Sequence, residues 1–184
     1  MTKAEIRRRH REKKRAANLC ISCGKEPPVN ESRCAGCNEK ANQNSRDWKR
    51  ANVANGLCRL CGARPYLSDT DTGERLSHNC EVCYLKIVAR NMLGSARFLY
   101  VLLDKLYRWD WKCAYAGRPL VLGKNLSFDH ALPISRYPDL KRDPSNLVPV
   151  DLGVNFVKRN LTGDEFVALA KEIVHHRDSV AHVN

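Results

Sequence analysis

The sequence predicts a modular α+β protein, built from several small units in a row instead of one large core. Three observations indicate this. The 184 residues are 28% charged and include only four Phe, which leaves little apolar material for a single large core. Eight of the nine Cys fall into four Cys-x-x-Cys pairs that form two copies of one pattern. From residue 109 onward the composition changes, and aromatic side chains and prolines recur.

The first segment, residues 1–18, is strongly basic. It holds eight Lys and Arg side chains, is rich in helix formers and lacks Gly and Pro, which predicts a basic helix or arm. Such a run is often only a solubilising tail, but like charges this dense repel one another unless phosphates neutralise them. With a net charge of +12, the chain therefore favours a nucleic-acid partner. The side chains expected to contact it here are Arg7, Arg8, Arg9, Lys13 and Lys14.

A repeat fills the next two segments, residues 19–56 and 57–111. The motif Leu19-Cys20-x-x-Cys23-Gly24 returns as Leu57-Cys58-x-x-Cys61-Gly62, and a second Cys-x-x-Cys pair follows in each copy. The second copy has extra residues around 68–73, which predict a longer hairpin loop. A helix-compatible stretch follows each copy, at about 39–52 and at about 84–109. We thus predict two ribbon modules, each with a linker helix.

The cysteine spacing points to zinc. Two Cys-x-x-Cys turns bring four thiolates to one point and complete a tetrahedral zinc site with no open position, so both sites would be structural. Disulfides or unligated thiols are the alternative, but no apolar signal-peptide core precedes the cysteines. The expected ligands are Cys20, Cys23, Cys34 and Cys37 for one ion and Cys58, Cys61, Cys80 and Cys83 for the other.

The remaining segment, residues 112–184, carries a different set of motifs. They are Leu126-Ser-Phe-Asp129-His130 with Pro133 after it, then Asn146-Leu, then Asn155-x-x-Lys158. In this order they resemble the HNH endonuclease family, over about residues 112–160. Asn155 stands at the family's third position, as in the H-N-N variant of phage and intron-encoded homing enzymes. Many members add further Cys-x-x-Cys pairs here, whereas Cys113 is alone and is expected to be a small buried hydrophobe.

The resemblance implies a ββα-metal fold, with strands near 119–122 and 125–130 packed on a helix near 150–160. His130 would be the general base that activates water, and Asn146 would hold His130 in place. Asp129 and Asn155 would face each other and hold one catalytic Mg²⁺ or Mn²⁺. Lys158 and Arg159 would contact phosphates. The loop that contains Arg136 either lies on the nucleic-acid backbone or is an inert connection.

A last helix is expected after the resemblance ends. The capping-box pattern Thr162-x-x-Glu165 opens it, and Phe166, Leu169, Ile173 and Val174 follow at helical spacing. We expect this helix to pack on the module before it.

Together these features predict a metal-dependent HNH endonuclease that cuts DNA, with zinc ribbons and a basic arm that bind it. RNA is disfavoured only by the resemblance. Two alternatives remain: a non-catalytic zinc-ribbon nucleic-acid binder, in which Asp129 and His130 merely satisfy backbone groups, or an HNH subunit of a larger complex, for example with a guide RNA. The sequence leaves a dimer open. No window approaches the ~18 apolar residues of a membrane span, so we expect a cytoplasmic, nucleoid-associated protein, which a phage could encode.

Overall fold

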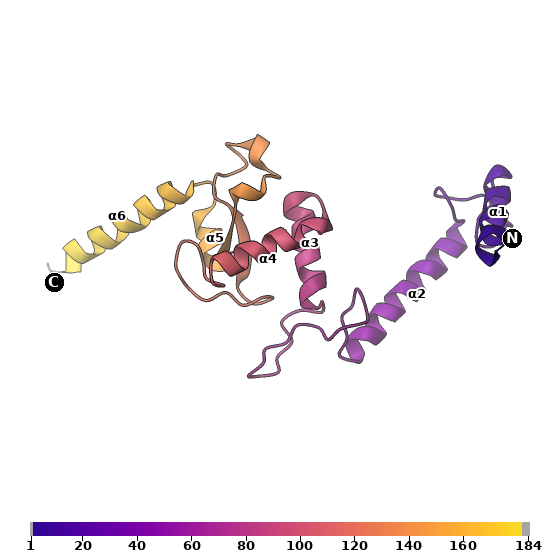
Figure 1. Cartoon of the computed structure of the whole chain (residues 1–184), viewed down its shortest axis with the longest axis horizontal. Helices are drawn as coiled ribbons and strands as arrows, with labels where there is room; N and C mark the ends of the chain where they lie inside the picture. The colour runs from indigo at the N-terminus through magenta and orange to yellow at the C-terminus, as the bar shows by residue number, and fades with distance from the viewer. Residues whose placement is uncertain (1, 182–184) are drawn as a thin grey trace. The chain divides into compact units, whose positions relative to one another are not determined.

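A computed structural model describes the backbone of residues 2–181 and the side chains of residues 2–179. It divides the chain into two compact units, Met1–Asn55 and Gly56–Asn184. The boundary between them lies one residue before the predicted boundary between the two cysteine segments. Unit 1 contains α1 (Lys3–Ala16), a cysteine-bearing loop and α2 (Ala35–Ala54) (Figure 1).

Helix α1 confirms the predicted basic helix. Its N-terminus is a capping box, in which the Thr2 hydroxyl accepts from the Glu5 N–H at 3.2 Å and the Glu5 carboxylate accepts from the Thr2 N–H at 2.6 Å. None of its residues is buried. Helix α2 begins directly after Cys34 and buries one residue, Asn52. Neither helix therefore contributes an apolar core to unit 1.

Unit 2 contains the remaining helices and the strands (Figure 1). In chain order these are α3 (Glu81–Leu93), η1 (Ala96–Phe98), α4 (Leu99–Arg108), β1 (Leu126–His130), η2 (Pro138–Leu140), η3 (Pro144–Asn146), β2 (Leu147–Asp151), α5 (Leu152–Lys158) and α6 (Gly163–Ala181). The single helix predicted at 84–109 is wrong. Gly94 adopts a left-handed conformation with φ of 79° and ends α3, and the Ser95 hydroxyl then caps the next turn.

The two strands form an antiparallel hairpin in which Leu126 pairs with Asp151 and His130 pairs with Leu147. The strand predicted at 119–122 is wrong. Pro119 makes only an isolated bridge to Lys112, and the chain then turns, because the Val121 carbonyl accepts from the N–H groups of Lys124 to Leu126. The partner of β1 is instead the segment directly before α5. Asp151 ends this strand and caps the helix by accepting from the Gly153 N–H at 2.9 Å.

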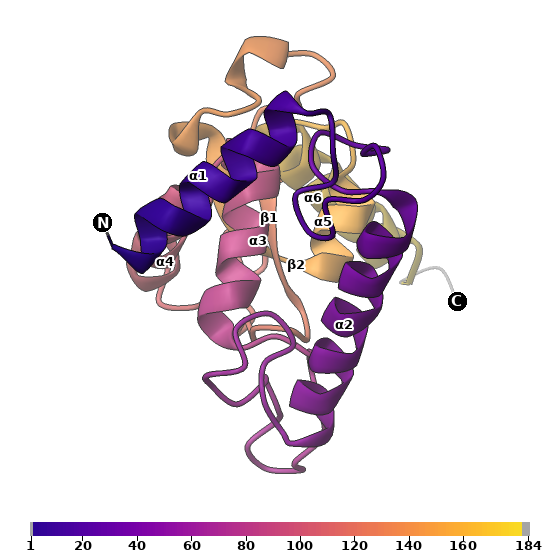
Figure 2. The ribbon, with the colours of Figure 1, turned by 90° about the vertical axis from the view of Figure 1, so that its right-hand side faces the viewer.

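One hydrophobic core joins α3, α4 and the hairpin. Leu85 and Leu102 from the helices and Leu147 and Val150 from β2 are fully buried in it. Helix α5 contacts both strands, and the hairpin lies between α5 and α4 (Figure 1; Figure 2). The predicted segments 57–111 and 112–184, as far as they are described, therefore fold as one unit around a shared core.

Helix α6 packs on this unit only through its first turn. The predicted capping box is present, since the Thr162 hydroxyl accepts from the Glu165 N–H at 3.2 Å. Phe166 lies edge-on to Tyr115 with ring centroids 5.7 Å apart. The other apolar residues of the predicted stripe, Leu169, Ile173 and Val174, are exposed. The helix thus packs on the module before it as expected, but only through its first turn at Phe166.

Candidate functional sites

The first cysteine cluster is formed by a tight turn and the start of α2. The Cys20 N–H donates to the Glu26 carbonyl at 2.8 Å, and the Gly24 N–H returns to the Cys20 carbonyl at 2.7 Å. Gly24 has a φ of 70°, a conformation that a side chain would strain. This turn presents Cys20 and Cys23, and the first turn of α2 presents Cys34 and Cys37.

The second cluster repeats this construction in unit 2. The Cys58 N–H donates to the Arg64 carbonyl at 2.7 Å, and the Gly62 N–H donates to the Cys58 carbonyl at 2.9 Å. The first turn of α3 supplies the other pair, Cys80 and Cys83. The extra residues of this copy form the expected hairpin loop, with an antiparallel bridge between Ser68 and Arg75.

Both clusters fit a tetrahedral metal ion. In each, the four sulfur atoms lie within 4.8 Å of one another. The Cys23 and Cys34 sulfurs are 3.7 Å apart, and those of Cys61 and Cys80 are 3.9 Å apart. Sulfur atoms about 2.3 Å from a central zinc ion would be about 3.8 Å apart. Such distances are too long for disulfides, and all eight thiols are free. Both groups could therefore hold structural metal ions such as zinc.

The electrostatics of the clusters also favour a cation. Burial raises the pKa of Cys20, but N–H donors of Cys23, Cys34 and Ser22 outweigh it and lower the pKa to about 5. At Cys34 the Cys37 N–H lowers the pKa, but burial and the neighbouring thiols outweigh it and raise the value to about 12. Four thiols this close cannot all ionise without a positive partner. A divalent ion would supply that partner.

The HNH-like residues gather where the hairpin meets α5. Along β1 the side chains alternate, so that Leu126 and Phe128 enter the core while Ser127 and Asp129 contact α5. The Asn155 side-chain amide donates to the Ser127 hydroxyl at 3.0 Å and to the Phe128 carbonyl at 3.5 Å. Asn155 thus lies against the strand that carries Asp129.

Lys158 does not lie where the sequence places it. Its side chain is fully buried, and its ammonium forms an ion pair with Asp129 Oδ2 at 2.9 Å and donates to the His130 carbonyl at 3.2 Å. The prediction that Lys158 contacts phosphate is therefore wrong, since a buried ammonium cannot reach a nucleic-acid backbone. The reason is that Lys158 occupies the last turn of α5 and points back under β1 to a buried carboxylate.

His130 and Asn146 are brought together at the end of β1, but not by a direct bond. His130 Nε2 lies 3.0 Å from the Lys141 carbonyl oxygen. The Asn146 side chain instead bonds both peptide groups of Leu132, accepting at 2.8 Å and donating at 2.9 Å. Asn146 therefore fixes the backbone that follows His130. The Lys141 carbonyl, and not Asn146 as predicted, contacts the imidazole of His130.

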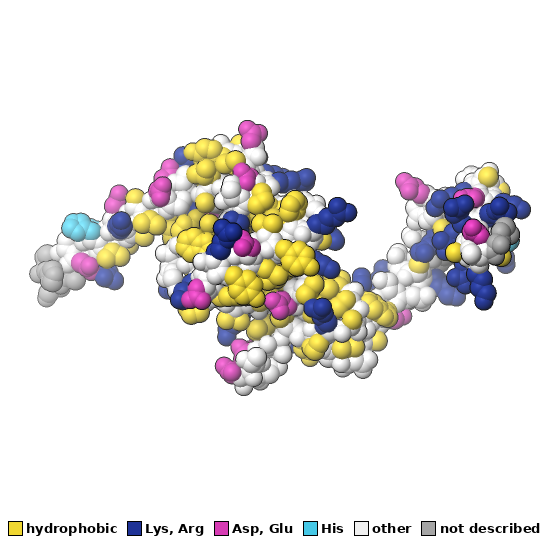
Figure 3. Space-filling model, in the orientation of Figure 1, with side chains coloured by type: hydrophobic (Ala, Val, Ile, Leu, Met, Phe, Trp, Pro, Cys, Tyr) yellow, Lys and Arg dark blue, Asp and Glu magenta, His cyan; other side chains and the backbone are white. Residues whose placement is uncertain are grey.

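The basic residues assigned to nucleic-acid binding differ in their surroundings. Arg7, Arg8, Arg9 and Lys13 are exposed on α1, where Lys and Arg side chains gather (Figure 3). Lys14 donates instead to the carbonyls of Ile21 and Ser22, both at 3.3 Å, so it braces the first cysteine turn. Arg136 Nη1 donates to both carboxylate oxygens of Glu165, and this ion pair raises the pKa of the guanidinium. Arg159 is exposed beside the Phe156 ring, 5.3 Å from its centroid.

Two residues of this region carry no signal in the sequence. Tyr115 donates its hydroxyl to Asp129 Oδ2 at 3.3 Å, and burial, followed by the Asp129 charge, raises the pKa of Tyr115 so that it stays protonated. Lys141 takes part through its main-chain carbonyl alone. Tyr115 has no motif around it and a carbonyl is present at every residue, so only the tertiary structure reveals them.

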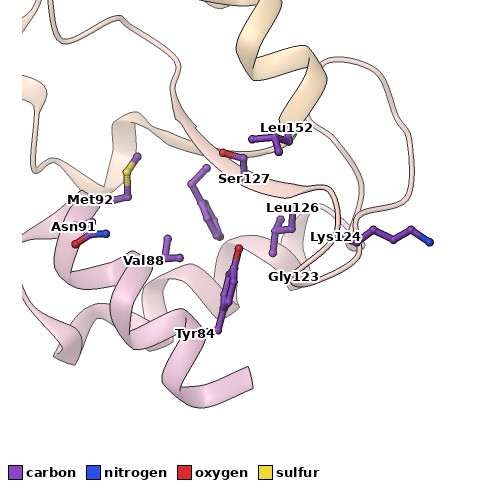
Figure 4. A pocket seen from close by; sticks show the side chains of 10 residues that line it. Tyr84, Val88, Asn91, Met92, Gly123, Lys124, Leu126, Ser127 and Leu152 are labelled. Atoms are coloured by element: carbon purple, nitrogen blue, oxygen red, sulfur yellow. The ribbon is translucent and has the colours of Figure 1, made fainter. Parts of the chain in front are cut away.

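A hollow of about 360 Å³ lies beside this site, between α3 and the first half of β1. Figure 4 shows Tyr84, Val88 and Met92 on its α3 side, with Leu126 and Ser127 opposite. None of His130, Asp129, Asn146 or Asn155 lines it. The hollow is mostly apolar, and the groups with catalytic potential lie outside it.

Comparisons of the chain with models of known protein families, with curated proteins and with solved structures found no match. Over the described residues, the structure contains no helix that combines the length and the apolar character needed to cross a membrane.

Proposed function

We propose that this chain is a metal-dependent endonuclease of the HNH type that hydrolyses DNA phosphodiester bonds. The observation that carries the proposal is the arrangement of a two-stranded hairpin followed by α5, with four residues of the HNH-like motifs within it. Asp129 and His130 end β1, Asn146 precedes β2 and Asn155 lies on α5. Asn155 bonds to Ser127, two residues before Asp129, and Asn146 bonds to Leu132, two residues after His130.

His130 is the proposed general base. A carbonyl oxygen can only accept a hydrogen bond, so the contact between Nε2 and the Lys141 carbonyl assigns the proton of the neutral imidazole to Nε2. That tautomer leaves Nδ1 as an acceptor that can take a proton from water. Asn146 supports this arrangement by fixing the Leu132 peptide groups, and with them the chain just beyond His130.

Asp129 and Asn155 have the donor chemistry of a Mg²⁺ or Mn²⁺ site. Asp129 Oδ1 and Asn155 Oδ1 are hard oxygens that make no hydrogen bond within the described part of the chain. When bound, such an ion would neutralise charge on the phosphate and stabilise the departing oxygen. Tyr115 and Lys158 hold Asp129 in place from the opposite side by binding Oδ2.

The remaining parts of the chain suit DNA binding. The exposed basic side chains of α1, namely Arg7, Arg8, Arg9 and Lys13, offer contacts to a phosphate backbone. Arg159, exposed beside Phe156 at the end of α5, offers another. In this proposal the two zinc-bound cysteine clusters stabilise the segments that contact DNA and take no part in the chemistry.

Cleavage of supercoiled plasmid DNA in Mg²⁺ or Mn²⁺ tests the proposal. We expect the zinc-loaded protein to nick the plasmid and His130→Ala to lower the rate by about 10²-fold or more, the usual contribution of a general base. His175→Ala, which changes an exposed histidine on α6, is the matched control and should cut at the wild-type rate. A wild-type protein that leaves the plasmid intact, or a His130→Ala variant as fast as wild type, would contradict the proposal.

Metal controls must separate the two kinds of site. After treatment with EDTA, Mg²⁺ alone should restore the full cleavage rate if the cysteine sites have kept their zinc, and only a lower rate if unit 1 has lost its zinc and with it the DNA contacts of α1. Zinc followed by Mg²⁺ should restore it in every case.

The ion pair between Asp129 and Lys158 favours a second candidate, a non-catalytic nucleic-acid-binding protein. In that function Asp129 serves only to neutralise a buried lysine. Such a protein would bind DNA or RNA with strong salt dependence and cut neither. Binding without cleavage by a well-folded, zinc-loaded protein would select this candidate, or a subunit that needs further partners.

A further inference from the structure

Lys158 places a positive charge next to Asp129, a proposed metal ligand. Its side chain has no exposed surface, and its ammonium lies 2.9 Å from Asp129 Oδ2 and 3.2 Å from the His130 carbonyl. The Tyr115 ring adds a cation–π contact, with the ammonium 5.9 Å from its centroid. A buried ammonium needs a counter-charge, and Asp129 is the one carboxylate with which Lys158 pairs among the described residues.

This pairing cancels the charge that would attract a divalent ion. Asp129 contributes −1, Asn155 contributes none and Lys158 contributes +1, so the three sum to zero. Protein Mg²⁺ sites of this kind are usually completed by one or two carboxylates together with substrate phosphates. Here the protein supplies two oxygen ligands but no net negative charge, so a phosphate has to provide it.

We propose that the divalent ion binds at Asp129 and Asn155 only together with a nucleic-acid phosphate, because Lys158 cancels the negative charge of Asp129. This inference rests on the proposed function. The contacts of the ion pair leave one oxygen of each proposed ligand without a hydrogen-bond partner among the described residues. Lys158 and Tyr115 both engage Oδ2 of Asp129, which leaves Oδ1 for the metal. Ser127 and Phe128 engage Nδ2 of Asn155, which leaves its Oδ1.

The consequence for function is that the activating metal ion and the DNA bind together. Without a phosphate backbone in the site, the protein would hold no activating ion. With one, metal and DNA would each strengthen the binding of the other by the same factor, because coupling between two ligands is reciprocal.

Mn²⁺ binding to the zinc-loaded full-length protein tests this, measured by the loss of the free Mn²⁺ signal in electron paramagnetic resonance. His130→Ala is used to prevent cleavage, and His130→Ala/Asp129→Ala with the same duplex DNA corrects for Mn²⁺ held by DNA itself. We expect about tenfold or more tighter Mn²⁺ binding with DNA than without it. DNA affinity, measured by fluorescence anisotropy, should rise by the same factor when Mn²⁺ is added. Equal Mn²⁺ affinity with and without DNA would overturn the inference.

Lys158→Met tests the role of the ammonium directly. Methionine keeps an unbranched apolar stem and removes the charge, so Asp129 becomes an unpaired carboxylate. We expect this variant to bind Mn²⁺ without DNA at least about tenfold more tightly than wild type. Lys171→Met, an exposed change on α6, should behave as wild type. An unchanged Mn²⁺ affinity in a folded Lys158→Met protein would contradict the inference. If that variant does not fold, the comparison of Mn²⁺ binding to His130→Ala with and without DNA still tests the inference.

The outcomes separate this inference from the proposed function. DNA cleavage together with DNA-independent Mn²⁺ binding would leave the nuclease intact and remove only the role of Lys158. A protein that does not cut DNA and binds no Mn²⁺ with or without it would remove both.

Discussion

The two cysteine clusters share one local design, yet the helices that follow them differ in character. Counted from Cys34 and Cys80, the first residues of the second Cys-x-x-Cys pairs, Leu85 of α3 corresponds to Glu39 of α2. On the same face of each helix, Leu85, Ala89 and Leu93 of α3 are buried. Their counterparts in α2 are Glu39, Gln43 and Asp47, and all three are exposed. The apolar face packs into a core, whereas the polar face bonds within its own helix, as between Gln43 and Asp47 at 2.8 Å.

The difference shows that a cysteine turn does not determine what stabilises the unit around it. In unit 1 the buried residues of the described part are Cys20, Cys34 and Asn52, so apart from the thiols it has no buried apolar side chain. In unit 2 the same kind of turn is attached to a core shared by two helices and a hairpin. We therefore expect unit 1 to depend on a metal ion bound by its four thiols, whereas unit 2 has a second source of stability.

Removal of zinc should give the largest effect and the clearest contrast. Structural zinc supplies on the order of 10 kcal/mol per site to folding. We expect a strong chelator to unfold unit 1 completely while α3, α4 and the hairpin keep their structure. Limited trypsin digestion followed by mass spectrometry measures this, because unit 1 should be cut throughout and a fragment of unit 2 should survive. Loss of both units at the same chelator concentration would show that the core of unit 2 is not self-sufficient.

Leu85→Ala and Glu39→Ala compare the matched helix positions. The first removes a fully buried side chain and should lower the free energy of unfolding of unit 2 by about 2–5 kcal/mol. The second changes an exposed residue and should alter stability by no more than about 0.5 kcal/mol. Urea unfolding of the zinc-loaded variants, followed by the fluorescence of Trp109 and Trp111 in unit 2 and Trp48 in unit 1, provides both values. Similar losses at the two positions would erase the contrast.

Lys14→Met probes the bracing of the first cluster. The Lys14 ammonium donates to two carbonyls of the cysteine turn, and the loss of such bonds costs about 1 kcal/mol. We expect the zinc affinity of cluster 1 to fall about fivefold and that of cluster 2 to stay unchanged. Competition with a chromophoric chelator measures both affinities. Lys13→Met, its exposed neighbour, is the control, and an equal loss in both variants would argue against a specific brace.

Acid should produce the smallest effect, and it should act on unit 2 through the cap of α5. The Asn125 side chain and the N–H groups of Gly153 and Val154 lower the pKa of Asp151 below its ordinary value. The stability that comes from this ionised cap is therefore present above about pH 4 and lost as the pH falls through the lowered pKa. We expect the urea midpoint of wild type to exceed that of Asp151→Ala at pH 7, and the gap to narrow progressively as the pH falls below about 4. Excess chelator in all samples removes zinc beforehand, so that zinc release does not contribute to the difference between the two urea midpoints. A difference that does not depend on pH would contradict a role for the ionised Asp151 carboxylate.

Local chemistry explains which features could be predicted. The cysteine clusters depend on residues close in sequence, since each Cys-x-x-Cys turn and the helix start after it form from neighbouring peptide groups. The capping boxes at Thr2 and Thr162 are also local, although only the second was predicted. The hairpin was predicted with the wrong partner strand because pairing joins residues 126–130 with 147–151 across a long loop. Nothing in the neighbourhood of either strand specifies that pairing.

The sequence by itself determined the two tetracysteine sites, the basic helix and the residues that resemble an HNH motif. These depend on spacing and composition, which act over a few residues at a time. The tertiary structure alone decided that Lys158 is buried against Asp129, that the Lys141 carbonyl holds His130 and that α3, α4 and the hairpin share one core. The physical reason is that burial and ion pairing depend on which distant segments meet, and a charged residue in a sequence does not reveal whether water or a carboxylate will surround it.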